Sequence, residues 1–315
     1  MSDKPFTTYE QQIEKLIKKK HIKVENKEYA IRTLRKISYF ALINGYKCIF
    51  KDNNTNRYKE NVCFEDIVSM YEFDQRLRNL LIRYILIIER QMKSLISYYF
   101  TETFSESQFE YLNVNNYDYQ RNNLRLEINK FVMAMSKVIQ SENEIYIKHS
   151  RENHNNVPLW VLTNALTFGT ISKMYSLMQQ RVKHKIISDF PNITKITQLG
   201  AMLRILTKFR NVCAHNERLY NYKTQMDILP DLEIYKILGI KKLQDQFECG
   251  IRDVFAVVII FKYMLDTSDF NDFFGELQSI IIRFSTPSNS VTKDDLLIEM
   301  GFPQNWECIL NIKLS

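Results

Sequence analysis

The sequence predicts an all-α fold, with a central helical bundle, an amino-terminal helical extension and further helices at the carboxy-terminal end. Only seven glycines and six prolines occur in 315 residues, which is few for a fold that is rich in turns. Apolar residues make up 45% of the chain and aromatic residues 13%, which is enough for a substantial core. These apolar residues recur at helical spacing over long stretches, and this periodicity is the main signal for helices.

The amino-terminal part predicts two helices and a loop. Residues 9–20 and residues 27–43 both carry apolar residues along one helical face. The polar run at residues 52–56 predicts a turn between two short segments, residues 46–50 and residues 61–64. A small hairpin formed by these two segments is one alternative for this region.

The middle of the chain holds the longest helical pattern, residues 64–100. Further helices are expected at residues 119–140 and 159–178, and a shorter one at residues 199–209. Residues 149–154 read as a polar loop. In the last third, periodic stretches predict helices at residues 241–265, 269–284 and 294–300, with a linker-like break at residues 285–290.

Charge is distributed unevenly along the chain, and we expect three regions: 1–62, 63–222 as the core, and 223–315 packing on that core. Residues 1–222 contain 34 Lys and Arg against 22 Asp and Glu, a balance of +12. Residues 223–315 contain 9 against 14, a balance of −5. A basic body is typical of proteins that bind polyanions such as RNA, although a charge of this size also serves solubility.

The cysteines and the lengths of the apolar runs indicate in which cellular compartment the protein is expected. None of the five cysteines forms a Cys-x-x-Cys or a zinc-type spacing, so they are expected to be reduced core residues. No metal or other cofactor is expected. The longest apolar run, residues 254–261, is far shorter than a membrane span, and the polar amino terminus does not resemble a signal peptide. We therefore expect a cytoplasmic protein with no membrane partner.

Arg210, Asn211 and His215 are the candidate catalytic residues. Arginine binds phosphate through a planar fork that keeps its charge, and histidine transfers protons near neutral pH. Asn211 and His215 are four residues apart and share one helical face. Arg210 points elsewhere, so it either reaches around the helix or serves a second copy of the site in a dimer. The alternative reading is a cationic cap at the negative end of a helix dipole.

Other polar residues are candidates for contacts with RNA. Glu89 either orients Arg210 or pairs with Lys93, four residues on, and basic clusters at two helix ends offer phosphate contacts. An arginine and a tyrosine just after the motif offer charge and base stacking. The full set is Glu89, Arg90, Lys208, Asn216, Arg218, Tyr220, Lys18, Lys19, Lys20, Arg181, Lys183 and Lys185.

Four blocks of the sequence carry a resemblance to a known family. They are residues 29–46, which end in Gly-Tyr, the long helical pattern at 73–93, the Pro-Trp and Phe-Gly-Thr segment at 157–178, and the motif segment at 208–222. In this order they resemble the Abi-like family, the AbiD/AbiF group of bacterial phage-resistance proteins in the HEPN superfamily. The resemblance implies a HEPN-like helical bundle for residues 63–222.

The same resemblance implies an activity. Relatives carry an Arg-x4-His motif that cleaves RNA without a metal ion, and Arg210 and His215 match its two ends. Two motifs face each other across a homodimer in active relatives, and an RNA or protein partner restrains the enzyme until phage infection. Asn216 stands where many relatives carry a second histidine. Two alternatives remain open: a non-catalytic protein that holds a dedicated non-coding RNA, and a purely structural helical protein.

Overall fold

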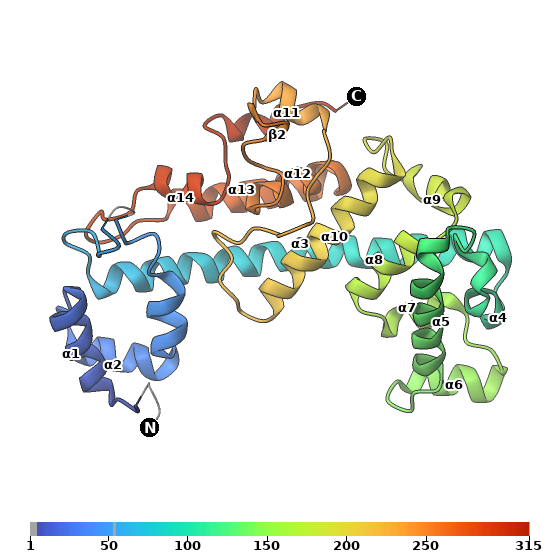
Figure 1. The fold of residues 1–315 in the computed structure, drawn as a ribbon, viewed down its shortest axis with the longest axis horizontal. Coiled ribbons are helices and arrows are strands. Elements are labelled where there is room, and N and C mark those ends of the chain that lie inside the picture. Colours follow the sequence, from blue (N-terminus) through green and yellow to red (C-terminus); the bar gives the residue numbers. More distant parts are fainter. Residues whose placement is uncertain (1–4, 53–54, 315) are drawn as a thin grey trace.

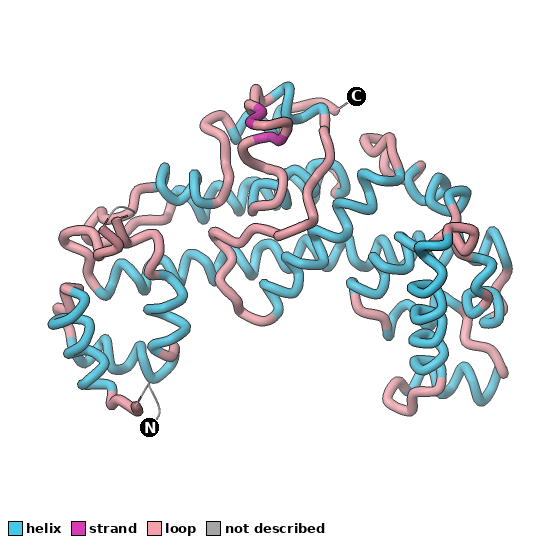
Figure 2. Tube along the Cα trace, in the orientation of Figure 1, coloured by secondary structure: helices cyan, strands magenta, loops and turns pink. Residues whose placement is uncertain are grey.

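The computed structural model describes residues 5–52 and 55–314 and confirms the all-α prediction (Figure 1). Helices and their connecting loops account for nearly all of the described chain (Figure 2). Among the described residues, one small antiparallel sheet pairs β1 (Lys242–Leu243) with β2 (Gln246–Phe247), and each strand is two residues long. No helix within the described residues is both long enough and apolar enough to cross a lipid bilayer.

Helix α3 (Phe64–Phe104) forms the long axis of the molecule (Figure 1). Its 41 residues include no glycine or proline, so nothing in the sequence interrupts a rod of roughly 60 Å. The N-cap residue of the helix is Cys63, whose backbone N–H donates to the Asp66 carboxylate at 2.9 Å. Asp66 also accepts hydrogen bonds from Ser288 and Ser290. The predicted break at residues 285–290 is therefore tied to the first turn of α3.

The amino-terminal lobe contains α1 (Tyr9–Lys20), α2 (Lys27–Lys36) and a π-helical turn, η1 (Phe40–Asn44). The single helix predicted at residues 27–43 is wrong, because the backbone becomes extended at Ile37 and the Ser38 hydroxyl accepts the Ala41 N–H, which starts a new turn. The hairpin alternative holds only next to the turn, where Lys51 forms one antiparallel bridge with Tyr58 and the Lys59 N–H donates to the Phe50 carbonyl at 2.9 Å. The two predicted segments do not pair with each other, because residues 46–50 are helical or turn and residues 62–64 bond to Lys23.

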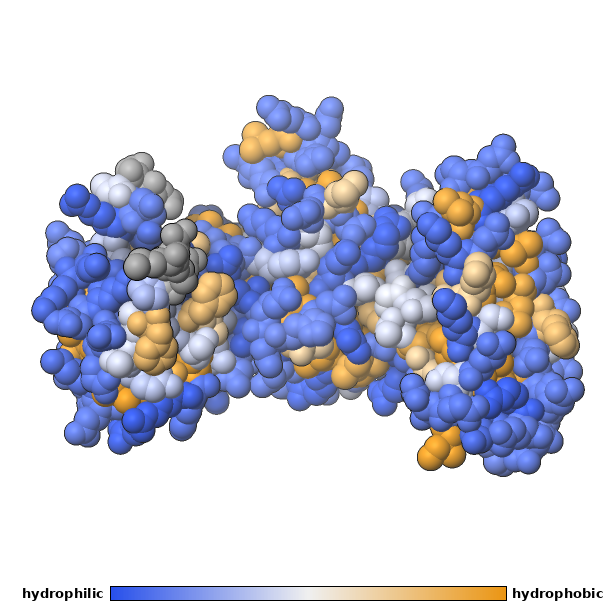
Figure 3. Space-filling model, turned by 60° about the horizontal axis from the view of Figure 1, so that its bottom comes forward, coloured by the Kyte–Doolittle hydropathy of each residue, from blue (hydrophilic) through white to orange (hydrophobic). Residues whose placement is uncertain are grey.

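The other end of α3 carries a lobe of short helices. These are α4 (Gln108–Leu112), η2 (Val114–Asn116), η3 (Asn122–Leu124), α5 (Arg125–Ile139), α6 (Ile145–His154), α7 (Leu159–Ala165), α8 (Phe168–Leu177) and α9 (Gln180–Ile187). The loop predicted at residues 149–154 is helical. The helix predicted at residues 159–178 divides in two where the Thr167 hydroxyl accepts the Thr170 N–H and caps α8. Exposed apolar side chains gather on this lobe (Figure 3), among them Leu126, Met133, Ile145 and Trp160.

Helix α10 (Ile196–Ala214) crosses α3 and packs against α3, α8 and α9. The chain then continues through α11 (Glu233–Ile237), β1, β2, α12 (Val254–Met264), α13 (Thr267–Ile282), α14 (Lys293–Glu299) and η4 (Trp306–Asn311). Helix α13 runs along α3, and α12 packs against α10 and α13 (Figure 1). This arrangement buries residues 198–203 of α10 and leaves its carboxy-terminal end just below α3 in the view of Figure 1.

Candidate functional site at the end of helix α10

The last turn of α10 presents His215 to solvent. His215 is the C-cap residue, and Asn216 follows it in the left-handed conformation with φ 54°. The Glu217 N–H donates to the Val212 carbonyl at 3.0 Å and the Asn216 N–H to the Cys213 carbonyl at 3.3 Å, which is the pattern of a Schellman cap. Asparagine tolerates this backbone conformation better than most residues do. Asn216 therefore ends the helix, and His215 lies exposed at its tip.

Arg210 lies on the side of α10 that faces α3. Its Nε is 3.7 Å from Oε2 of Glu89, whose side chain is 8% exposed, whereas the Arg210 side chain is 31% exposed. Lys93 approaches the other Glu89 oxygen at 3.1 Å. Glu89 thus contacts both partners that the sequence suggested. Neither Arg210 Nε nor Glu89 Oε2 has a hydrogen-bond partner among the described residues, so the pair orients the guanidinium without a direct hydrogen bond.

The helix separates Arg210 from His215. Five residues correspond to a rotation of about 500°, which places the two side chains roughly 140° apart around the axis and about 7.5 Å apart along it. Asn211 and His215 share a face and are both exposed. One chain therefore presents the imidazole and the carboxamide together, and the arginine on a different face of the helix.

A buried polar network, which the sequence analysis missed, fixes the segment that follows His215. Asp74 accepts hydrogen bonds from Arg78 Nη1 at 2.5 Å, from the Tyr46 hydroxyl at 2.7 Å, and from the N–H groups of Leu219 and Tyr220 at 3.0 and 2.7 Å. Arg78 also donates to the Glu217 carbonyl at 3.1 Å. Burial raises the pKa of the Asp74 carboxyl, and the Arg78 cation and the other donors oppose that rise. We call this network the Asp74 clamp.

Burial corrects three of the predicted RNA contacts. Glu89 is 6% exposed and its carboxylate faces Arg210 and Lys93, and the other two are Tyr220 and Lys183. Tyr220 is 0% exposed, so its ring is inside the core and does not offer a stacking surface. Lys183 is 8% exposed and donates to the Ser176 carbonyl at 2.7 Å, and burial lowers the pKa of its ammonium to about 8. Neither side chain reaches the surface where a phosphate or a base would bind.

The other candidates lie at three separate places. Arg90 and Lys208 are exposed, and in the sequence they lie next to Glu89 and close to Arg210. Arg218 donates to the Gly45 carbonyl at 2.6 Å. Arg181 packs 4.9 Å from the Phe104 ring centroid, and Lys185 pairs with Glu102 at 3.0 Å, both in the lobe that contains α9. Lys18, Lys19 and Lys20 end α1 at the opposite end of α3 (Figure 1).

Neither a reactive cysteine nor a metal-binding cluster is found at this end of α10 among the described residues. Burial raises the pKa of the Cys213 thiol to about 12, so it is a packing residue at neutral pH. The expectation of core cysteines is wrong for Cys48 and Cys308, which are exposed. Within residues 5–52 and 55–314, no group of three His, Cys, Asp or Glu side chains is placed to hold a metal ion.

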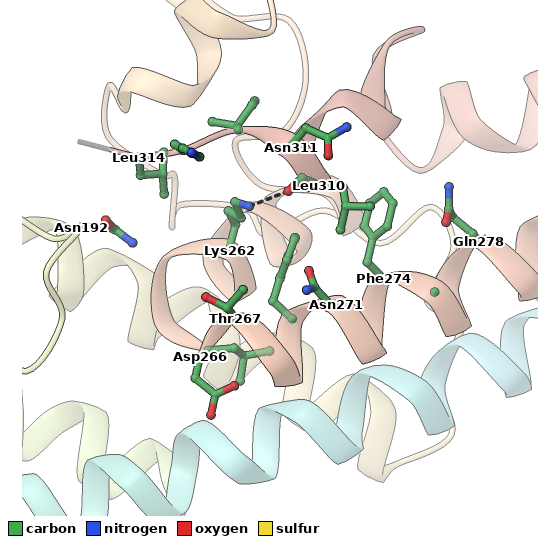
Figure 4. Close-up of a pocket in the computed structure, with 15 residues that line it drawn as sticks. Asn192, Lys262, Asp266, Thr267, Asn271, Phe274, Gln278, Leu310, Asn311 and Leu314 are labelled. Atoms are coloured by element: carbon green, nitrogen blue, oxygen red, sulfur yellow. Dashed lines mark hydrogen bonds between the residues drawn. The ribbon is translucent and has the colours of Figure 1, made fainter.

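A pocket of about 930 Å³ lies away from the motif, between α12, α13 and the carboxy-terminal tail (Figure 4). Lys262 points across it and donates to the Leu310 carbonyl at 3.0 Å. Asn192, Asn271 and Gln278 also line it. None of the motif residues contributes to this pocket, so the candidate site is an exposed helix end and not an enclosed cavity.

Comparison of the sequence with models of known protein families identifies the family to which the chain belongs. The model of the family described as Abi-like protein matches residues 32–221, which contain the Asp74 clamp and the whole motif. No curated protein and no solved structure matches the chain. The matched region covers well over half of the sequence and includes most of the four blocks whose resemblance was noted. The chain belongs to the Abi-like protein family.

Proposed function

We propose that this protein is a HEPN-type endoribonuclease that cleaves RNA without a metal ion, using the exposed end of α10. The observation that carries the proposal is the combination of an exposed His215 at the helix tip with an Arg210 that a buried Glu89 holds. The Abi-like family suggests a role in abortive-infection defence against phage. RNA cleavage is a direct way to stop a phage from replicating.

The chemistry needs a proton acceptor and a cation. His215 accepts the proton of the ribose 2′-hydroxyl, the 2′-oxygen attacks the adjacent phosphorus, and the bond to the 5′-oxygen breaks. The products are a 2′,3′-cyclic phosphate and a 5′-hydroxyl, which takes up a proton as it leaves. Arg210 binds the phosphate and stabilises the charge that builds up on it. Asn211, on the same face as His215, orients the imidazole or donates to the phosphate.

A homodimer completes the site. Within one chain Arg210 and His215 point from different faces of α10, so a single copy presents one histidine and keeps its arginine toward α3. Two motifs facing each other supply a second His215 to protonate the leaving oxygen. They also bring one chain's arginine near the other chain's histidine. Asn216 has a structural role in the helix cap, which leaves His215 as the only histidine of the motif.

Such an activity has to be restrained in an uninfected cell. We propose that an RNA or protein partner holds the enzyme inactive until infection, as a toxin is held by its antitoxin. Under the alternative function, the same surface binds a dedicated non-coding RNA and cleaves nothing.

Incubation of the purified protein with labelled single-stranded RNA in excess EDTA tests the proposal. We expect cleavage at the same rate with EDTA as with added Mg²⁺, because no step uses a metal ion. Cleavage that stops in EDTA contradicts the proposed mechanism. Intact RNA that stays bound to the protein under both conditions favours the alternative of a non-catalytic RNA-binding protein.

Changes at the Arg210–Glu89 pair test the role of the guanidinium. Arg210→Lys keeps the charge but loses the planar fork, so we expect a loss in cleavage rate of roughly 10²-fold. Glu89→Gln leaves Arg210 in place but frees its orientation, and we expect a smaller loss of roughly tenfold. Cleavage rates under single-turnover conditions measure both effects.

The matched control for Glu89→Gln is Glu102→Gln, the same change on the same helix at an exposed carboxylate that pairs with Lys185. It is expected to leave the cleavage rate unchanged. Equal losses in Glu89→Gln and Glu102→Gln would show that the Glu89 effect is not specific to Arg210.

A further inference from the structure

A cluster of lysines gathers around two tyrosines in the amino-terminal lobe. The Lys20 ammonium lies 5.7 Å from the ring centroids of both Tyr39 and Tyr58, and the Lys51 ammonium lies 5.8 Å from the Tyr58 centroid. Lys47 is close enough to repel Lys20 electrostatically. We call Lys20, Lys47 and Lys51, with the two tyrosines, the amino-terminal lysine cluster.

The lysines around Lys20 repel it. Burial lowers the pKa of Lys20, and repulsion from Lys47, Lys15 and Lys51 lowers it further. No carboxylate forms a salt bridge with any of these four lysines in the part of the chain that the structure describes, whereas the neighbouring Lys18 pairs with Glu14. Like charges that converge on a half-buried position destabilise the fold unless an anion joins them.

Two hydroxyl groups in the cluster lack a partner. The hydroxyls of Tyr39 and Tyr58 are buried, and neither has a hydrogen-bond partner among the described residues. Burial raises the pKa of both tyrosines, so both remain protonated donors at neutral pH. Buried polar groups in native proteins are nearly always satisfied, and a phosphate oxygen accepts from hydroxyl and ammonium groups alike. A pocket of about 660 Å³ next to the cluster is lined by Tyr39 and Lys20, among others.

The cluster connects to the motif through Arg218. Its Nη1 donates to the Gly45 carbonyl at 2.6 Å and lies 3.9 Å from the Cys48 sulfur. Arg218 comes three residues after His215, and Lys47 lies between its two contacts in sequence. Arg218 therefore joins the segment that follows α10 to residues 45–48 of the amino-terminal lobe.

We propose that the amino-terminal lysine cluster is a phosphate subsite that holds the backbone of single-stranded RNA on one side of the cleavage point. The inference rests on the proposed function, since that function supplies RNA as the ligand. The subsite reads phosphate and not base identity, because its donors are ammonium and hydroxyl groups. It lies apart from the Arg210–His215 motif and explains why the amino-terminal lobe is basic.

Binding of a 2′-O-methyl RNA oligonucleotide, which 2′-OH chemistry does not cleave, tests the subsite. In the Lys20→Gln/Lys51→Gln protein we expect about tenfold weaker binding at low salt, and a salt dependence shallower by about 0.7 in log–log slope per lost phosphate contact. The control is Lys236→Gln/Lys241→Gln, which makes the same charge change at two exposed lysines of the carboxy-terminal region. The control is expected to bind as the wild type does.

A second variant separates binding from folding. Tyr39→Phe/Tyr58→Phe removes only the two hydroxyls without a partner, so we expect the melting temperature to stay the same or rise while RNA affinity falls several-fold. Unchanged affinity in both cluster variants, or an equal loss in the lysine control, overturns the subsite.

Cleavage of ordinary RNA is scored separately, which keeps the two proposals distinguishable. A wild-type protein that binds through the cluster but does not cleave supports the subsite and contradicts the ribonuclease. A wild-type protein that cleaves, with cluster variants that bind and cleave equally well, supports the ribonuclease and overturns the subsite.

Discussion

Replacement of His215 by alanine is expected to slow RNA cleavage by roughly 10²- to 10⁴-fold, the usual contribution of a general acid or base. The side chain is exposed and has no hydrogen-bond partner among the residues that the structure describes, whereas the backbone N–H of His215 donates to the Asn211 carbonyl at 3.0 Å. Alanine keeps that backbone bond. The melting temperature should therefore stay within a degree or two of the wild type while cleavage is lost.

The matched control is His184→Ala, the same change at an exposed histidine of α9. It should cleave at the wild-type rate. Single-turnover cleavage of a labelled RNA measures both variants. A His215→Ala protein that cleaves as fast as His184→Ala would remove His215 from the site.

Replacement of Arg78 by methionine is expected to destabilise the protein by roughly 3–5 kcal/mol, because it leaves the buried Asp74 carboxylate without its cation. Asp74 is 0% exposed and keeps the Tyr46 hydroxyl and two backbone donors. Those bonds do not replace the lost charge. Because the Asp74 clamp positions residues 217–220, we also expect cleavage to fall in parallel.

Urea unfolding measures this effect against Arg83→Met, the same change five residues later on α3. Arg83 pairs with Glu276 at the surface, with both side chains about half exposed, so its loss should cost less than about 1 kcal/mol. Similar free energies of unfolding for the two variants would contradict a central role for the Asp74 clamp.

The long helix α3 was easier to predict than the shorter elements: residues 242–247 form β1 and β2 where the sequence predicts a helix at 241–265, which begins only at Val254. The 41 residues of α3 are free of glycine and proline, and their apolar spacing indicates one long helix. The breaks depend on single hydroxyls that compete with the backbone: Ser38 interrupts the predicted second helix, and Thr167 caps α8. A serine or threonine inside an amphipathic pattern fits either a helix interior or a cap, and tertiary packing decides between them.

The motif residues of the candidate site could be predicted from the sequence, but the buried residues that position them could not. Arg210, Asn211 and His215 stand out because their side chains suit phosphate chemistry. Asp74 and Arg78 look like an ordinary surface pair four residues apart, and only the folded chain shows that both are buried. For Tyr220 the sequence suggested exposure where the structure shows burial. A tyrosine close to the motif suggests base stacking, but the Tyr220 ring packs nearly parallel to the Tyr46 ring inside the core.

The most direct test of the proposed mechanism is mass spectrometry of the products from an RNA oligonucleotide cleaved in EDTA, beside the same RNA with one 2′-deoxyribose at the mapped cleavage position. Attack by the 2′-hydroxyl predicts a 2′,3′-cyclic phosphate and a 5′-hydroxyl from the first RNA, and no cut at that position in the second. A cut that persists at the deoxyribose, or products that end in a 3′-hydroxyl and a 5′-phosphate, would contradict it.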